Sequence, residues 1–149
     1  MTVLNSRVAA LEQSYDELLA LCDALEAVAD GLPYAVNARV CLGLSASLEP
    51  LLARTHGLEE AVLFPLLAAS QNPQLSQTLE RLRQEHLADH STAAEVGECL
   101  HDLGAGRPTV SADAIGYLLR SFFESMRRHV QSERELLAMA RPGDDHGSP

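Results

Sequence analysis

Six side chains able to bind a metal ion recur at helical spacing in this sequence. They form pairs of residues four positions apart: His56 with Glu60, His86 with His90, and His129 with Glu133. Positions i and i+4 lie on one face of an α-helix, so each pair presents its two side chains in the same direction. Imidazoles and carboxylates are ligands for transition metals, and their pairing predicts a metal site.

Each pair falls on the apolar stripe of a long helical segment. The stripe through His56 also contains Leu52, Leu63 and Leu67, and leucines and alanines flank the other two pairs at similar spacing. Burying an ionised side chain costs several kcal/mol unless a counter-charge or a metal neutralises it. Because all of these groups would be buried together, we expect cations among them.

Turn signals divide the chain into the helices that must position these pairs. Leu and Ala dominate the sequence and β-branched residues are sparse, which favours helices. The predicted helices cover residues 3–30, 36–70, 75–103 and 112–139, with Ser111 as the N-cap of the last. Four long helices with short loops predict an all-α, up-down-up-down antiparallel four-helix bundle.

Counting residues from the shared turns places the three pairs, and Tyr15 on the first helix, at one level of this bundle, since each helical residue adds about 1.5 Å. Pro50 and Pro65 lie inside the second helix, where each removes a backbone donor. We therefore expect kinks or a break at these two positions.

Length and charge limit the domain organisation and the partners. The 149 residues suit one domain, residues 1–141, followed by a disordered tail, residues 142–149. A net charge of −10 predicts no binding to nucleic acid or to a membrane surface. The chain has no apolar signal core, no membrane-spanning stretch and no CxxC pair among its three cysteines, so a cytoplasmic location is expected.

The number of ligands indicates the kind of metal site. Four imidazoles and two carboxylates exceed the needs of one tetrahedral zinc ion and suit a pair of iron or manganese ions. Ferritin-type bundles use Glu-x-x-His pairs instead. None of the four inward histidines has Glu three residues before it, because those positions hold Ala53, Arg83, Leu87 and Met126.

The order of the motifs resembles the haemerythrin-like (HHE) family. The chain offers HGLEE followed by VLFP, then EHLADH, then HVQSE, and the resemblance extends from about Val8 to Leu137. It implies two non-haem iron ions, joined by an oxo or hydroxo group, with manganese or zinc as alternative metals. It also implies that dioxygen, peroxide or nitric oxide is the small ligand, so the chain would bind, sense or decompose one of these.

The resemblance implies a role for each paired residue. His86, His90 and His129 would bind one iron ion, His56 and a helix-one residue would bind the other, and Glu60 and Glu133 would bridge the two. The second iron would keep an open position for the small ligand. Asp89 is the alternative to His90 in this set.

The first helix departs from the family, because it lacks the expected histidine. Tyr15 is the side chain on its inward stripe that would replace it, as a tyrosinate ligand of iron(III), and the alternative is an ordinary core tyrosine. Glu12 and Asp16 flank the stripe and are further candidates. A phenolate would favour the ferric state, which favours oxidation sensing, peroxide breakdown or iron binding over reversible oxygen carriage.

Residues beside the pairs are expected to lie off the cluster, and a role in supporting the ligands stays open for three of them, Glu59, Arg127 and Arg128. Glu59, Arg127 and Arg128 should face water or neighbouring helices, and His101 and His146 should be solvated. Two other functions stay open. One is a metal-free interaction bundle whose inward His and Glu pair with one another, and the weaker one is a zinc or mixed-metal hydrolase.

Overall fold

The computed structural model describes residues 2–141, and within that range it contains helices and turns but no strand. The helices are α1 (Val3–Gly31), α2 (Ala38–Leu58), the π-helical η1 (Glu59–Leu63), α3 (Phe64–Ala69), α4 (Pro73–Gly104) and α5 (Ala112–Ala140). Because α2, η1 and α3 follow one another without a loop, they form one long segment. The predicted all-α class is confirmed, and the predicted tail lies outside the described residues.

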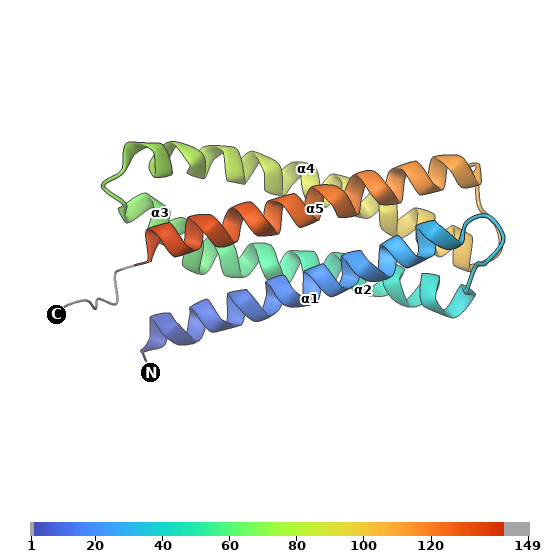
Figure 1. Cartoon of the computed structure of the whole chain (residues 1–149), viewed down its shortest axis with the longest axis horizontal. Coiled ribbons are helices and arrows are strands. Elements are labelled where there is room, and N and C mark those ends of the chain that lie inside the picture. Colours follow the sequence, from blue (N-terminus) through green and yellow to red (C-terminus); the bar gives the residue numbers. More distant parts are fainter. Residues whose placement is uncertain (1, 142–149) are drawn as a thin grey trace.

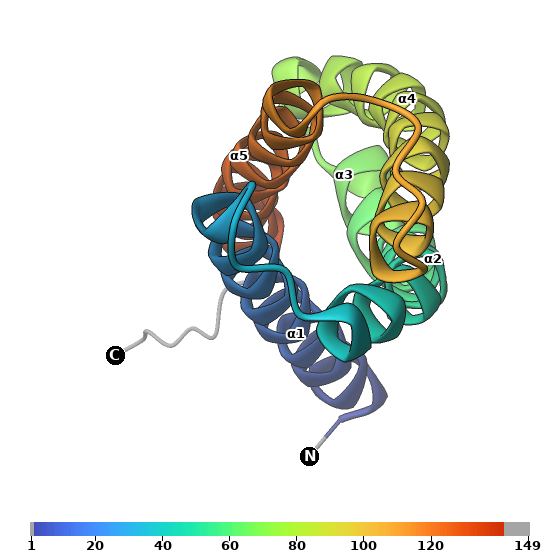
Figure 2. The same ribbon diagram turned by 90° about the vertical axis from the view of Figure 1, so that its right-hand side faces the viewer.

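The long helices surround a common core. α1 contacts α2 and α5, and α4 also contacts α2 and α5, so the four segments form a ring when seen end-on in Figure 2. The α1–α2 and α4–α5 connections lie at one end, and the α3–α4 connection lies at the other (Figure 1). Leucines from every segment are completely buried between them, including Leu11, Leu25, Leu52, Leu100 and Leu119.

Side-chain caps begin each long helix. Thr2, Asn37, Asn72 and Ser111 each accept a hydrogen bond from a backbone N–H two or three residues further on. These bonds satisfy donors that the first helical turn leaves free. The predicted cap at Ser111 is confirmed. None of the helices in residues 2–141 has the length and apolar character that a bilayer-spanning segment needs.

The two prolines inside the second segment differ in effect. α2 runs through Pro50 without interruption, whereas Pro65 is the second residue after η1. The N–H of Phe64, between η1 and Pro65, donates to the Glu59 carbonyl. Proline lacks an N–H and its ring crowds the carbonyl four residues back, and the wider π turn relieves that conflict. A π turn holds about one residue more than an α turn, which changes by one position the residues that face the core before it.

Arg134 joins α5 to α1 near the middle of the bundle. Its guanidinium donates to the carboxylates of Glu12, at 2.6 Å, and Asp16, and it lies over the Tyr15 ring, 5.5 Å from the ring centre. Glu12 and Asp16, which were candidate ligands, are therefore engaged by Arg134.

Arg134→Met should lower the free energy of unfolding by about 1 kcal/mol, because it removes two partly exposed ion pairs and keeps much of the apolar stem. Urea denaturation measures the loss. Arg128→Met is the matched control, since Arg128 is exposed on the same helix. Equal losses in the two variants would show that the Arg134 contacts add nothing.

Candidate metal centre

Glu59 lies where all four helical segments meet, and its side chain is 1% exposed. The Tyr15 hydroxyl from α1 donates to Glu59 Oε2 at 2.5 Å, and His86 Nε2 from α4 lies 2.7 Å from Oε1. Glu133 from α5 also hydrogen-bonds this carboxylate. One buried carboxylate thus connects α1, α4 and α5 to the second segment.

Glu59, and not Glu60, faces the core, so the predicted orientations of both residues were wrong. The Glu60 side chain is 63% exposed. Positions i+3 and i+4 both approach the face of His56, so their spacing alone does not distinguish them. The π turn does, because it aligns Glu59 with the buried Leu63 and directs Glu60 outward.

Three imidazoles from α2 and α4 lie in contact. The rings of His56 and His86 are stacked, with centroids 3.7 Å apart and planes 7° from parallel, and both residues are 6% exposed. His90 is half-buried and meets His56 edge-on, with 3.0 Å between its Nε2 and His56 Nδ1. Burial, with the neighbouring His86, lowers the pKa of His56 to about 3. His56 is therefore neutral at physiological pH, the form that binds metals.

A second cluster surrounds His129 on α5. Its Nδ1 lies 3.0 Å from Asp89 Oδ2, and its Nε2 lies 3.9 Å from Glu85 Oε1. The Asp89 hydrogen bond raises the pKa of His129. Asp89 is buried and also lies 3.9 Å from His56 Nε2, so it connects this cluster to the stacked imidazoles. Glu85 was not predicted, although it lies one helical turn before Asp89 on the same face.

Two sets of three side chains could hold a cation. Within each set, one donor atom from each residue lies within 4.8 Å of the others. The sets are His56–Glu59–His86, which is buried, and Glu85–His129–Glu133, which is partly buried. Ligands about 2.1 Å from an ion lie roughly 3 Å from one another, so small side-chain movements would close either set.

The structure brings most of the predicted ligands into this network. Those that lie in it, on all the long helices, are Tyr15, His56, His86, His90, His129 and Glu133. Glu60 lies outside it and Glu59 takes its place. His101 is exposed as predicted, and His146 lies outside the described residues.

The side of the centre formed by α1 and α2 carries hydroxyl groups. Ser14 Oγ and Thr55 Oγ1 lie 2.6 Å apart, and each residue is 1% exposed. Thr55 also lies 2.9 Å from the Leu51 carbonyl, to which it can donate. α1 therefore contributes a phenol and a hydroxyl at this level.

The pKa values of the two buried carboxylates shift in opposite directions. Burial raises the pKa of Glu133 to about 11, and the neighbouring Glu59 adds to the rise. Burial also opposes ionisation of Glu59, but hydrogen bonds from Glu133, His86 and Tyr15 outweigh it and lower its pKa. Protonated Glu133 therefore donates to ionised Glu59, and a cation could replace that proton. Burial and the Glu59 charge raise the pKa of Tyr15 well above its usual range.

The metal-free chain should be most stable between pH 4.5 and 6.5. The pKa of His56 is 6.5 in the unfolded chain and about 3 in the folded one. Between these two pH values His56 takes up a proton only on unfolding, so stability falls as the pH falls from 6.5 toward 3. The pKa of Glu133 is 4.5 in the unfolded chain and about 11 in the folded one. Between these two pH values Glu133 loses its proton only on unfolding, so stability falls as the pH rises from 4.5 toward 11. Each effect favours unfolding by up to about 1.4 kcal/mol per pH unit outside that interval.

Urea denaturation across pH measures both effects in chelator-treated protein. Glu133→Gln should flatten the alkaline decline and leave the acidic one. Stability that rises steadily from neutral pH to pH 9 would contradict the placement of Glu133.

The donors in this network fit a transition-metal ion. Imidazole nitrogen and carboxylate oxygen are the ligands that iron, manganese and zinc bind. Comparison with protein families gives a match of residues 6–140, which span all the long helices, to the Hemerythrin HHE cation binding domain. Comparisons with curated proteins and with solved structures gave no significant match. The chain belongs to the haemerythrin HHE cation-binding domain family.

Proposed function

We propose that this chain binds two non-haem iron ions inside an up-down-up-down antiparallel bundle, and that it senses or reacts with dioxygen, peroxide or nitric oxide. The observation that supports this most is the presence of two three-residue ligand sets that the Glu59–Glu133 hydrogen bond connects. A site for a single ion would need only one of them. Manganese and zinc are the alternative metals, because they accept the same donors.

Each set would hold one ion. His56, Glu59 and His86 form the buried set, and Glu85, His129 and Glu133 form the other. Glu59 and Glu133 lie between the two, in the bridging place that the family resemblance implied for Glu60 and Glu133. Bound iron would supply the redox chemistry toward the small ligand.

The chain's own side chains would prepare the site for that chemistry. His56 is held neutral, Glu59 is held ionised, and Glu133 keeps a proton that the incoming ion displaces. The Phe64 ring lies against His86, with centroids 5.1 Å apart, and helps to exclude water from the buried set. Asp89 orients His129 through the 3.0 Å contact at Nδ1.

A metal-free interaction bundle is the second candidate, and one observation favours it. The inward His and Glu side chains hydrogen-bond one another, as in the Glu59–His86 and Asp89–His129 contacts. Metal content separates the two functions, because an interaction bundle would purify and refold without iron or manganese and would not bind them on addition.

Tyr15 is proposed as a ligand of iron(III) in the loaded protein. We expect a broad visible phenolate-to-iron absorption band that Tyr15→Phe abolishes. The hydrogen bond of 2.5 Å from the Tyr15 hydroxyl to Glu59, a member of the buried set, supports this proposal. An unchanged spectrum in the variant would leave Tyr15 as a hydrogen-bond donor to Glu59 and remove it from the ligand set.

We expect the protein to sense its small ligand or to decompose peroxide, and not to carry dioxygen reversibly. Iron(II)-loaded protein should oxidise in dioxygen, because a phenolate favours the ferric state, and it should not recover its reduced spectrum under vacuum. Gas evolution on adding peroxide would identify a peroxide-decomposing enzyme. Full recovery of the reduced spectrum under vacuum would contradict the proposal and indicate a carrier.

A further inference from the structure

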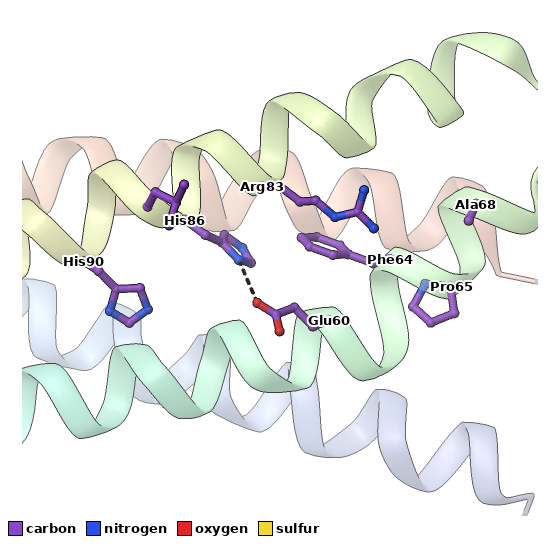
Figure 3. Close-up of a pocket in the computed structure, with 8 residues that line it drawn as sticks. Glu60, Phe64, Pro65, Ala68, Arg83, His86 and His90 are labelled. Carbon is purple, nitrogen blue, oxygen red and sulfur yellow. Dashed lines mark ion pairs between the residues drawn. The ribbon is translucent and has the colours of Figure 1, made fainter.

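A surface pocket of about 560 Å³ lies beside the candidate centre, between α4 and the segment formed by η1 and α3. Its lining includes the apolar residues Phe64, Pro65 and Leu87. In Figure 3, Glu60 faces His86 across the pocket and Arg83 lies over the Phe64 ring. The polar groups are Glu60, Arg83, His86 and His90. Because His86 and His90 belong to the network described above, the pocket reaches the centre.

The His86 ring separates the pocket from the buried ligand set. Its Nε2 lies 2.7 Å from Glu59 Oε1, on the inner side. Its Nδ1 is buried and has no hydrogen-bond partner among residues 2–141, and it points toward Glu60 in the pocket wall (Figure 3). Buried nitrogen atoms without a partner are uncommon in native proteins. One imidazole thus offers a nitrogen to each side.

Adjacent carboxylates flank this ring on its two sides. Glu59 meets Nε2, and the neighbouring Glu60 places Oε2 3.7 Å from Nδ1 while its side chain stays 63% exposed. Consecutive residues of a helix point about 100° apart, and the π turn determines that Glu59, and not Glu60, is the one that faces inward. His90, also in the pocket wall, lies 3.0 Å from His56 through its Nε2. The pocket residues therefore contact two members of the buried set.

We propose that this pocket is the route by which the metal cation reaches the centre, with Glu60 Oε2 and His86 Nδ1, which lie 3.7 Å apart, forming an outer, transient position. The inference rests on the proposed metal-binding function. From the outer position the ion moves to His56, Glu59 and His86. Glu60 attracts the cation, and the Arg83 guanidinium in the same pocket repels it, so these two residues set the rate of uptake.

Cobalt(II) uptake by the metal-free protein tests the route, because cobalt is stable in air and its bound form absorbs visible light. Stopped-flow absorption gives the association rate, and the end point gives the ions bound per chain. We expect Glu60→Gln to slow uptake about fivefold and Arg83→Gln to speed it about threefold, since each changes one charge beside the path. The number of ions bound should stay the same.

Glu98→Gln is the matched control, because Glu98 is exposed on α4 and lies outside the pocket. It removes the same charge and should change the rate less than twofold, since salt screens charges more than about 8 Å apart. An unchanged rate in Glu60→Gln, an equal slowing in Glu98→Gln, or fewer ions bound to Glu60→Gln would each overturn the route. In all three cases the wild type still binds metal. A wild type that takes up no cobalt would overturn the proposed function itself.

Discussion

Glu59→Gln should weaken metal binding by at least about 100-fold, whereas Glu60→Gln should leave the equilibrium affinity within about threefold. Glu59 is buried, ionised and a member of the His56–Glu59–His86 set. Its amide replacement keeps the size of the side chain and removes the charge that an ion requires. Glu60 lies outside both sets, and a transient outer position alters uptake and release together.

Calorimetric titration with cobalt(II) or anaerobic iron(II) measures both affinities. The adjacent pair is its own control, because the two substitutions are chemically identical and differ only in the face of the helix they occupy. Stronger weakening of metal binding by Glu60→Gln than by Glu59→Gln would mean that Glu60, four residues after His56, is the ligand and that Glu59 is not.

Saturation with metal should raise the melting temperature by about 10 °C or more. An ion that binds only the folded chain adds about 4 kcal/mol per site at a free concentration one thousand times its Kd. For a domain of this size, each kcal/mol shifts the melting temperature by about 2–4 °C. Two sites therefore predict a shift that scanning calorimetry resolves easily.

The same experiment on Glu59→Gln separates metal binding from folding. Without metal this variant should melt lower than the wild type, because the carboxylate that accepts hydrogen bonds from Tyr15, His86 and Glu133 is lost. The shift that metal produces in each protein is therefore the quantity compared. The variant should also respond weakly to added metal. Identical melting curves for the wild type in metal and in chelator would favour the metal-free interaction bundle.

The helices and the level of the site could be predicted from the sequence, because apolar periodicity and turn residues report directly on burial. Leu and Ala at helical spacing predicted the long segments to within a few residues, and the predicted cap at Ser111 begins the last of them. The convergence of His56, His86 and His129 followed from counting residues from the turns.

The choice between neighbouring residues could not be predicted, because it depends on the rotation of a helix by less than one residue. Glu59 and Glu60 both suit the face of His56, and the π turn before Pro65 decides between them. Pro65 was the available signal, since a proline inside a helix forces a local adjustment. A kink or break was expected at Pro65, but its effect on which of Glu59 and Glu60 faces the core was not considered.

The polar partners of the predicted ligands also could not be predicted from residue spacing along the chain. Asp89, buried between His129 and His56, depends on how α4 rotates against α5. The Ser14–Thr55 pair depends on the contact between α1 and α2. Small hydroxyl residues are common in helices, so their types alone carry no signal of a site.

The number of metal ions bound per chain tests the central claim most directly. Elemental analysis of the wild type, loaded and then freed of loose metal, should give about two equivalents of iron, and the double variant Glu59→Gln/Glu133→Gln should retain almost none. Wild-type protein that holds no iron, manganese or zinc, or a double variant that still holds two ions, would contradict it.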